Sequence, residues 1–174
     1  VDQSNVFAKV WEELSNGNNL GIFPEGGSHD QSDLLPLKVG VAICGLGAMS
    51  QYKGTKIKVV ACGLKYFKPS KFRSSMILEY SAPFEVDPEL VQEYVEDKRQ
   101  ACSKLLAKIE RTLRTVTFSA PSYKELRAIY LARRLYLPTS QAESYTEEEI
   151  NELYKRFFKG YQTCRGEQVV EEIM

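Results

Sequence analysis

Histidine, tryptophan and net charge are scarce in this sequence. Its 174 residues include one histidine and one tryptophan, and 23 basic side chains balance 23 acidic ones. Proteins that coat nucleic acid usually carry a basic excess, so the absence of net charge disfavours that class. The chain is 43% hydrophobic and 11% aromatic, which excludes disorder over its whole length. This length and composition predict roughly one globular unit with a real core.

The sequence also lacks paired cysteines and long apolar runs. Its four cysteines, Cys44, Cys62, Cys102 and Cys164, lie far apart without a C-x-x-C pair. This spacing argues against a disulfide scaffold or a zinc site and fits a reducing compartment. The longest apolar run, residues 39–49, is shorter than the ~20 residues of a membrane-spanning helix. Because the chain begins with valine and shows no signal peptide, we expect it to be a piece of a longer protein.

The first third of the chain predicts a helix, a strand, a loop and a second helix. Apolar residues recur at helical spacing over residues 6–14, and Asn16-Gly17 provides a stop. Residues 20–23 form an apolar run that predicts a strand, which Pro24 would end. A polar loop, residues 24–38, then precedes a run of small residues that predicts a close-packed helix over 39–49.

The remainder predicts two strands followed by helices. Residues 56–62 and 76–80 have strand patterns, and Asp87-Pro88 predicts the start of one helix that runs to about Thr115. Two capping boxes then open further helices, from Ser122 with Glu125 to Tyr136 and from Thr146 with Glu149 to about Lys159, with Gly160 as the C-cap. The alternation predicts an α/β fold with a largely parallel sheet flanked by helices, and an all-helical C-terminal third.

The segment from Phe23 to Asp30, F-P-E-G-G-S-H-D, has the strongest functional pattern. An apolar strand that ends in proline delivers a carboxylate and two glycines to a sheet edge, where open α/β folds bind ligands. Glycine lets backbone amides approach an anion closely. The alternative is a tight turn that binds nothing, with a solvated Glu25 and with Ser28 or Asp30 as a helix cap.

Other motifs accompany this segment in a fixed order. They include Leu37-Lys38-x-Gly40, the run Val59 to Tyr66, and, further along, Phe67-x-Pro69-x-Lys71-Phe72-Arg73-Ser74, Ala120-Pro121-x-Tyr123, Ala132 to Tyr136 and Arg156-Phe157-x-x-Gly160-Tyr161. The ordered set resembles the glycerolipid (PlsC-like) acyltransferase family, and is most similar to the fungal-type glycerol-3-phosphate/dihydroxyacetone-phosphate acyltransferases of the endoplasmic reticulum. F-P-E-G would be the third of four signature blocks, and the strand near Val60 the fourth.

This resemblance implies a function and a domain organisation. Residues 1–120 would be the C-terminal part of the acyltransferase domain, and residues 121–174 a helical extension. The whole protein would transfer a fatty acyl group from acyl-CoA to the sn-1 hydroxyl of glycerol 3-phosphate or dihydroxyacetone phosphate. Acyl-CoA would be a co-substrate, with no further cofactor, no metal and no nucleic acid. The resemblance further implies the cytosolic face of the endoplasmic reticulum membrane, with attachment through segments outside this chain.

The family's catalytic block, H-x4-D, is absent from this sequence. The only histidine, His29, lies within the third block, and the position five residues later is Leu34 rather than aspartate. We therefore expect the general base upstream of Val1 and no turnover by this chain alone. The arginine-bearing second block is also absent, and Ala61 occupies the place of a proline in the fourth. The alternative is a non-catalytic module that binds a membrane surface or a partner.

By resemblance, the third block and a lysine after it form the substrate-binding residues. Phe23 and Pro24 would fix the strand end, Glu25 and Gly26 would shape the glycerol-phosphate pocket with Gly27 and Ser28, and Lys38 would meet the phosphate as a point charge. The alternative for Lys38 is a surface lysine that caps the next helix.

Other polar or reactive residues have both a functional and a plain interpretation. His29 would form a dyad with Asp30 or Asp33, or would be a capped or solvated loop histidine, since no second histidine or nearby cysteine completes a zinc site. Cys44 and Cys62 are expected to be small core residues rather than nucleophiles.

The densest basic and aromatic cluster follows the fourth block. It comprises Lys65, Lys68, Lys71 and Arg73 with Tyr66, Phe67 and Phe72. Such a cluster suits anionic headgroups, the phosphates of coenzyme A or single-stranded nucleic acid. The plain interpretation is a connector between strands with solvated lysines. Arg133 and Arg134 are expected on a solvated or salt-bridged helix face.

Overall fold

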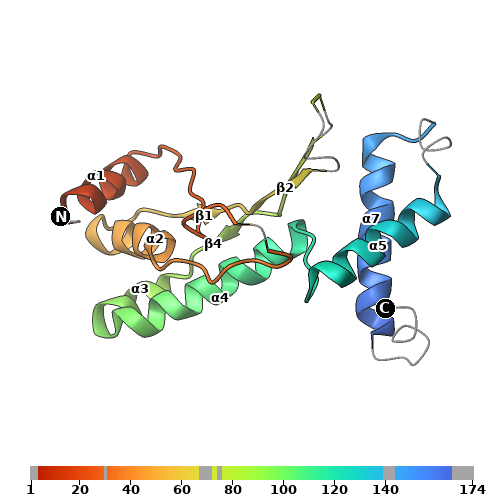
Figure 1. The fold of residues 1–174 in the computed structure, drawn as a ribbon. Helices are drawn as coiled ribbons and strands as arrows, with labels where there is room; N and C mark the ends of the chain where they lie inside the picture. The colour runs from red at the N-terminus through yellow and green to blue at the C-terminus, as the bar shows by residue number, and fades with distance from the viewer. Residues whose placement is uncertain (1–3, 30, 67–71, 74–75, 139–143, 166–174) are drawn as a thin grey trace. The chain divides into compact units, whose positions relative to one another are not determined.

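The computed structural model describes residues 4–29, 31–66, 72–73, 76–138 and 144–165. The chain forms two compact units. The first contains residues 1–29, 35–63 and 79–116, and the second contains residues 30–34, 64–78 and 117–174. The boundary between the units falls within strands β2 (Cys62–Tyr66) and β3 (Met76–Tyr80), and Figure 1 shows the elements coloured in chain order.

The first unit is built from helices around a short strand pair. Its helices are α1 (Ser4–Ser15), α2 (Gly40–Gln51), α3 (Pro88–Glu96) and α4 (Lys98–Val116). Strands β1 (Lys58–Val59) and β4 (Phe84–Glu85) pair antiparallel, with Lys58 opposite Glu85 and Val59 opposite Phe84. The core joins apolar residues of α2, α3, α4 and the strands, and its largest fully buried side chains are Leu46 and Leu105.

Helix α2 confirms the prediction of close packing from a run of small residues. In Figure 1 it lies beside α1, and the indole of Trp11 on α1 packs against Gly47 of α2. A Cβ on Gly47 would come within 2.5 Å of the Trp11 indole, whose Nε1 donates to the carbonyl oxygen of Ile43 at 3.1 Å. Glycine at this position therefore lets the indole reach the helix backbone. Gly40 has no such neighbour, since nothing lies within 4 Å of its Cβ position.

The second unit contains helices α5 (Tyr123–Tyr136) and α7 (Glu147–Cys164), which cross and pack together (Figure 1). Its core is aromatic: Phe118 stacks on Phe158 with ring centroids 4.7 Å apart. Both expected helix starts are confirmed. Ser122 accepts the backbone N–H of Glu125, and Thr146 forms a complete capping box with Glu149. The expected stop at Gly160 is wrong, because α7 continues to Cys164.

The largely parallel sheet predicted from the sequence is wrong, although the mixed α/β class is confirmed. The strands form two small antiparallel sheets, β1 with β4 and β2 (Cys62–Tyr66) with β3 (Met76–Tyr80). Residues 20–23 form no strand in the described part of the chain, and Phe23 is 79% exposed. An apolar run forms a strand only where a neighbouring ladder accepts its backbone hydrogen bonds, and sequence pattern alone does not reveal that partner.

Two of the expected long elements are divided. The predicted strand over 56–62 becomes β1 and the start of β2, and the predicted helix over 87–115 becomes α3 and α4. The helix break lies at Asp97, which has extended backbone angles. Its carboxylate accepts the N–H groups of Arg99 and Gln100 at 3.0 and 3.1 Å, and so caps a new helix. Aspartate favours helix caps over helix interiors because its side chain competes for backbone donors.

Several predicted environments also need correction. Cys62 is exposed rather than buried, because β2 alternates and Cys62 occupies an outward position, whereas Cys44 is buried as expected. Lys65 is only 5% exposed rather than solvated, and its ammonium lies 4.2 Å from the centroid of Phe118 and 3.2 Å from Asn151 Oδ1. Of the remaining basic and aromatic cluster, residues 67–71 lie outside the described residues.

The two arginines of α5 have different surroundings. Arg133 is half-buried and its guanidinium lies 4.7 Å from the ring centroid of Tyr154, to whose hydroxyl its Nη2 donates at 3.0 Å. This residue therefore packs against α7 instead of facing solvent. Arg134 is exposed, as the sequence predicted.

A charged hydrogen bond joins the two helices of the second unit. The hydroxyl of Tyr161 on α7 donates to Glu125 Oε1 on α5 at 2.6 Å. This hydrogen bond is the main reason why the pKa of Glu125 lies below its usual range. Burial raises this pKa, whereas Ser122 and Arg165 lower it further. Burial, followed by the hydrogen bond to Glu125, raises the pKa of Tyr161.

We predict that Gly47→Ala destabilises the first unit by about 1–3 kcal/mol, the usual range for overpacking. The added methyl group would clash with the indole of Trp11. The matched variant Gly40→Ala should instead be neutral or stabilising by about 0.5 kcal/mol, because it reduces unfolded-state entropy without a clash. Urea denaturation of both variants, followed by Trp11 fluorescence, measures the difference. Equal stabilities would contradict the assigned contact.

We predict that Tyr161→Phe weakens the dependence of stability on acid pH. A depressed carboxyl pKa in the folded state contributes stability above the unfolded pKa, and this contribution is lost as pH falls through the folded pKa. Without the tyrosine hydroxyl, the pKa of Glu125 should rise and less stability should be lost between about pH 6 and pH 3. Urea titrations at several pH values, followed by helix circular dichroism, test this. Parallel pH profiles for the two proteins would contradict it.

Candidate functional site

The F-P-E-G segment forms a tight turn in the first unit. The N–H of Gly26 donates to the carbonyl oxygen of Phe23 at 3.1 Å, so Pro24 and Glu25 occupy the two central positions. Pro24 suits the first of these because its ring fixes φ near the required value. Gly26 has φ +73°, a left-handed conformation that side chains disfavour. Local sequence therefore explains the shape of the turn without help from the rest of the fold.

The turn is attached to the start of helix α2. The N–H of Lys38 donates to the carbonyl oxygen of Pro24 at 2.7 Å, which ties the turn to the residue two positions before Gly40. The stem of Lys38 crosses Gly26: its Cγ and Cε lie 3.0 and 3.3 Å from the position that a Gly26 Cβ would occupy. Gly26 thus provides both the turn geometry and the space through which the lysine passes.

Glu25 is the centre of a hydrogen-bond network. Its Oε2 accepts the backbone N–H of Leu35 at 2.8 Å and lies 2.6 Å from Nε2 of His29. The side chains of Glu25 and His29 are 24% and 21% exposed, so both stay accessible at their edges. The tight turn of the plain interpretation is confirmed, but its solvated Glu25 is wrong, because the carboxylate is hydrogen-bonded. Its carboxylate is held in place by one backbone donor and one imidazole.

His29 pairs with Glu25, four residues earlier, a contact that the sequence interpretations did not name. The sequence suggested a dyad with Asp30 or Asp33, or a capped or solvated loop histidine, and the bare solvated histidine is excluded by this contact. Asp30 lies outside the described residues, and Asp33 Oδ1 accepts the N–H of Leu34 at 2.8 Å. The E-x-x-x-H spacing was visible in the sequence, but only the turn geometry makes the two side chains meet in a loop.

The other residues predicted for the site lie around this turn. Phe23 is exposed, Ser28 is exposed, and nothing lies within 4 Å of the Cβ position of Gly27. Lys38 is exposed, and among the described residues no carboxylate is paired with its ammonium. The structure therefore brings Glu25, Gly26 and Lys38 together, with open backbone at Gly27 beside them.

The site can hold an anion and orient a hydroxyl group. Lys38 supplies a positive charge with three donors, and a glycine backbone with open space admits a phosphate closely. The Glu25 carboxylate, compensated by His29 and the N–H of Leu35, can accept a hydrogen bond from a hydroxyl. Among the described residues, no three or more histidine, cysteine, aspartate and glutamate side chains come together in a group that could hold a metal ion.

The backbone N–H of Ala61, in the fourth block, takes part in a hydrogen bond. Its N–H donates to Ser81 Oγ at 3.0 Å, while the N–H of Ser81 donates to the carbonyl oxygen of Ala61 at 2.9 Å. A proline at this place would remove the first of these hydrogen bonds. Gly63, two residues after Ala61, lies very close to Val116. A Cβ on Gly63 would overlap the carbonyl oxygen of Val116.

Comparison with known proteins supports the resemblance seen in the motifs. Glycerol-3-phosphate O-acyltransferase 1 of Saccharomyces cerevisiae is 41% identical over 99% of this chain, and glycerol-3-phosphate O-acyltransferase 2 of the same yeast is 47% identical over 79%. The chain is similar to fungal-type glycerol-3-phosphate acyltransferases. An uncharacterized acyltransferase of Schizosaccharomyces pombe is 40% identical over 79% of the chain. The resemblance that the motifs indicated is therefore confirmed.

The matches cover only part of each relative. The chain spans 23%, 19% and 21% of the lengths of these three proteins. No family model matches the chain, and no solved structure matches it. The helices within the described residues include none long and apolar enough to cross a membrane.

We predict that Gly26→Ala destabilises the first unit by about 1–2 kcal/mol, because a side chain disfavours positive φ and would press on the stem of Lys38. Gly27→Ala is the matched control, since Gly27 has no close neighbour and no positive φ. It should change stability by less than about 0.5 kcal/mol. Denaturant unfolding of the two variants measures this, and equal losses would contradict the turn geometry described above.

Proposed function

We propose that this chain is part of an acyl-CoA-dependent glycerol-3-phosphate O-acyltransferase. The observation that carries this proposal is the 41–47% identity to two yeast proteins named glycerol-3-phosphate O-acyltransferase, which for the first extends over 99% of this chain. The reaction would transfer a fatty acyl group to the sn-1 hydroxyl of glycerol 3-phosphate. Dihydroxyacetone phosphate is the alternative acceptor, since it offers the same phosphate and a hydroxyl at the equivalent end.

In this proposal the turn around Glu25 binds the acceptor. The ammonium of Lys38 meets the phosphate, and the open backbone at Gly27 allows the phosphate to approach. Glu25 accepts a hydrogen bond from a glycerol hydroxyl while His29 and Leu35 hold the carboxylate in position. These residues act by positioning and electrostatics, which contribute substantially to catalysis when the groups are preorganised.

The chemical step requires a general base, which we propose lies in a part of the longer protein outside this chain. The base would belong to the H-x4-D block of the longer protein and would remove the proton of the acceptor hydroxyl. The oxygen would then attack the thioester carbonyl, and coenzyme A would leave as the thiol after protonation. No covalent enzyme intermediate is needed. The longer protein would work at the cytosolic face of the endoplasmic reticulum membrane.

We predict that Lys38→Met in the full-length protein raises the KM for glycerol 3-phosphate about tenfold, with a smaller change in kcat. Methionine retains an unbranched stem across Gly26 but removes the charge, so the variant isolates the ammonium. Lys53→Gln, at an exposed lysine outside the site, is the matched control and should leave KM unchanged. Steady-state kinetics with varied acceptor and fixed acyl-CoA measures the effect.

Two outcomes would overturn parts of this assignment. An unchanged KM in Lys38→Met would remove Lys38 from the acceptor site. Absence of acyl transfer by the native full-length protein, together with its co-sedimentation with liposomes, would favour the non-catalytic module instead. Transfer to dihydroxyacetone phosphate with a higher kcat/KM than to glycerol 3-phosphate would replace the proposed acceptor.

A further inference from the structure

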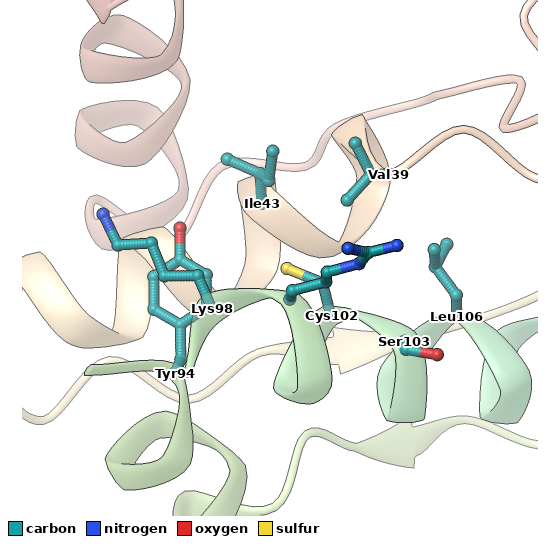
Figure 2. A pocket seen from close by; sticks show the side chains of 8 residues that line it. Val39, Ile43, Tyr94, Lys98, Cys102, Ser103 and Leu106 are labelled. Carbon is teal, nitrogen blue, oxygen red and sulfur yellow. The ribbon is translucent and has the colours of Figure 1, made fainter. Parts of the chain in front are cut away.

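A cavity of about 400 Å³ opens between helices α2, α3 and α4 of the first unit. Its size lies within the range of about 300–1,000 Å³ that is typical of small-molecule sites. Figure 2 shows Val39 and Ile43 on one side of it, and Cys102, Ser103 and Leu106 of α4 on the other. The cavity does not include the turn around Glu25, and neither the motifs nor the relatives' names assign it a role.

The walls of this cavity are largely apolar. Val39 and Ile43 are four residues apart at the start of α2, as are Cys102 and Leu106 on α4, so each pair presents one helix face. Burial raises the pKa of the Cys102 thiol, and the nearby charge of Lys98 opposes this effect only in part. The thiol is therefore neutral at physiological pH. The cavity therefore offers a trough of branched aliphatic side chains and a neutral thiol, a surface that suits an alkyl chain.

The mouth of the cavity carries positive charge. Lys98 and Arg99, at the start of α4, line the cavity and are exposed, and the Lys98 ammonium lies 5.7 Å from the ring centroid of Tyr94. None of the residues that line the cavity is acidic. The neighbouring carboxylate of Asp97 accepts the N–H groups of Arg99 and Gln100 as a helix cap. Charge at the mouth thus complements an anion whose tail enters the trough.

We propose that this cavity binds a single-chain anionic amphiphile. The alkyl chain lies between Val39, Ile43 and Leu106, and the acidic head group contacts Lys98 and Arg99. Two sources share this chemistry: a fatty carboxylate and a single-chain alkyl phosphate. Binding here does not rest on the proposed function, because it requires no turnover.

Methyl-detected NMR of the chain tests the proposal directly. The probes are dodecanoate and dodecyl phosphate, each below its critical micelle concentration, with dodecyltrimethylammonium as a cationic control of equal chain length. We expect saturable shifts of the Ile43 and Leu106 methyl groups with both anions, and at least tenfold weaker binding of the cation. Comparison of the two anions identifies the preferred source. Equal binding of the cation, or no saturable shift at Ile43 and Leu106, would overturn the proposal.

Variants separate the head-group contact from the trough. The double variant Lys98→Gln/Arg99→Gln should weaken anion binding about tenfold. Arg111→Gln, an exposed arginine further along α4 that does not line the cavity, is the matched control and should bind normally. Ser103→Trp should block the mouth, because Ser103 is exposed at its edge. Circular dichroism verifies each fold. Unchanged affinity in folded samples of both the double variant and Ser103→Trp would overturn the proposal.

Discussion

The close packing of α2 is the constraint on which the first unit depends. Ala42, Leu46 and Ala48 are completely buried in it, and Gly47 admits the indole of Trp11 against the helix backbone. Small residues allow neighbouring helices to approach more closely than leucine-rich faces would, which offsets the poor helix propensity of glycine. The position of everything attached to the start of α2 follows from this packing.

Two candidate sites lie at the start of α2. Lys38, just before α2, receives the F-P-E-G turn through the carbonyl oxygen of Pro24, and Val39 begins the wall of the apolar cavity. A polar turn and an apolar trough are thus positioned by one buried helix. Such a scaffold is rigid where precise geometry is needed, because the helix has little freedom to move within a packed core.

Local sequence signals predicted most helix boundaries. Contacts between residues far apart in the sequence were not predicted. Ser122 and Thr146 open helices as expected because capping depends on residues three positions away. Residues 20–23 were expected to form a strand, yet a strand requires a second segment that no local pattern specifies. The helix break at Asp97 lies between these two cases. The capping preference of aspartate is a local signal, but the helical periodicity on both sides of it predicted one continuous helix. The burial of Lys65 against Phe118 joins residues far apart in sequence and had no local signal.

For the candidate site, sequence identified the residue types but not their partnerships. The turn at Gly26 follows from proline and glycine alone, and so was predictable. The contact of His29 with Glu25 was not, since four-residue spacing guarantees proximity only on a helix. In the proposed site, this contact would affect the electrostatics of acceptor binding. A free carboxylate beside Lys38 would oppose an incoming phosphate, whereas a carboxylate already bonded to an imidazole and to the N–H of Leu35 directs less negative potential at it. In the proposed site, the same glutamate would then orient a hydroxyl group without excluding a phosphate bound by Lys38.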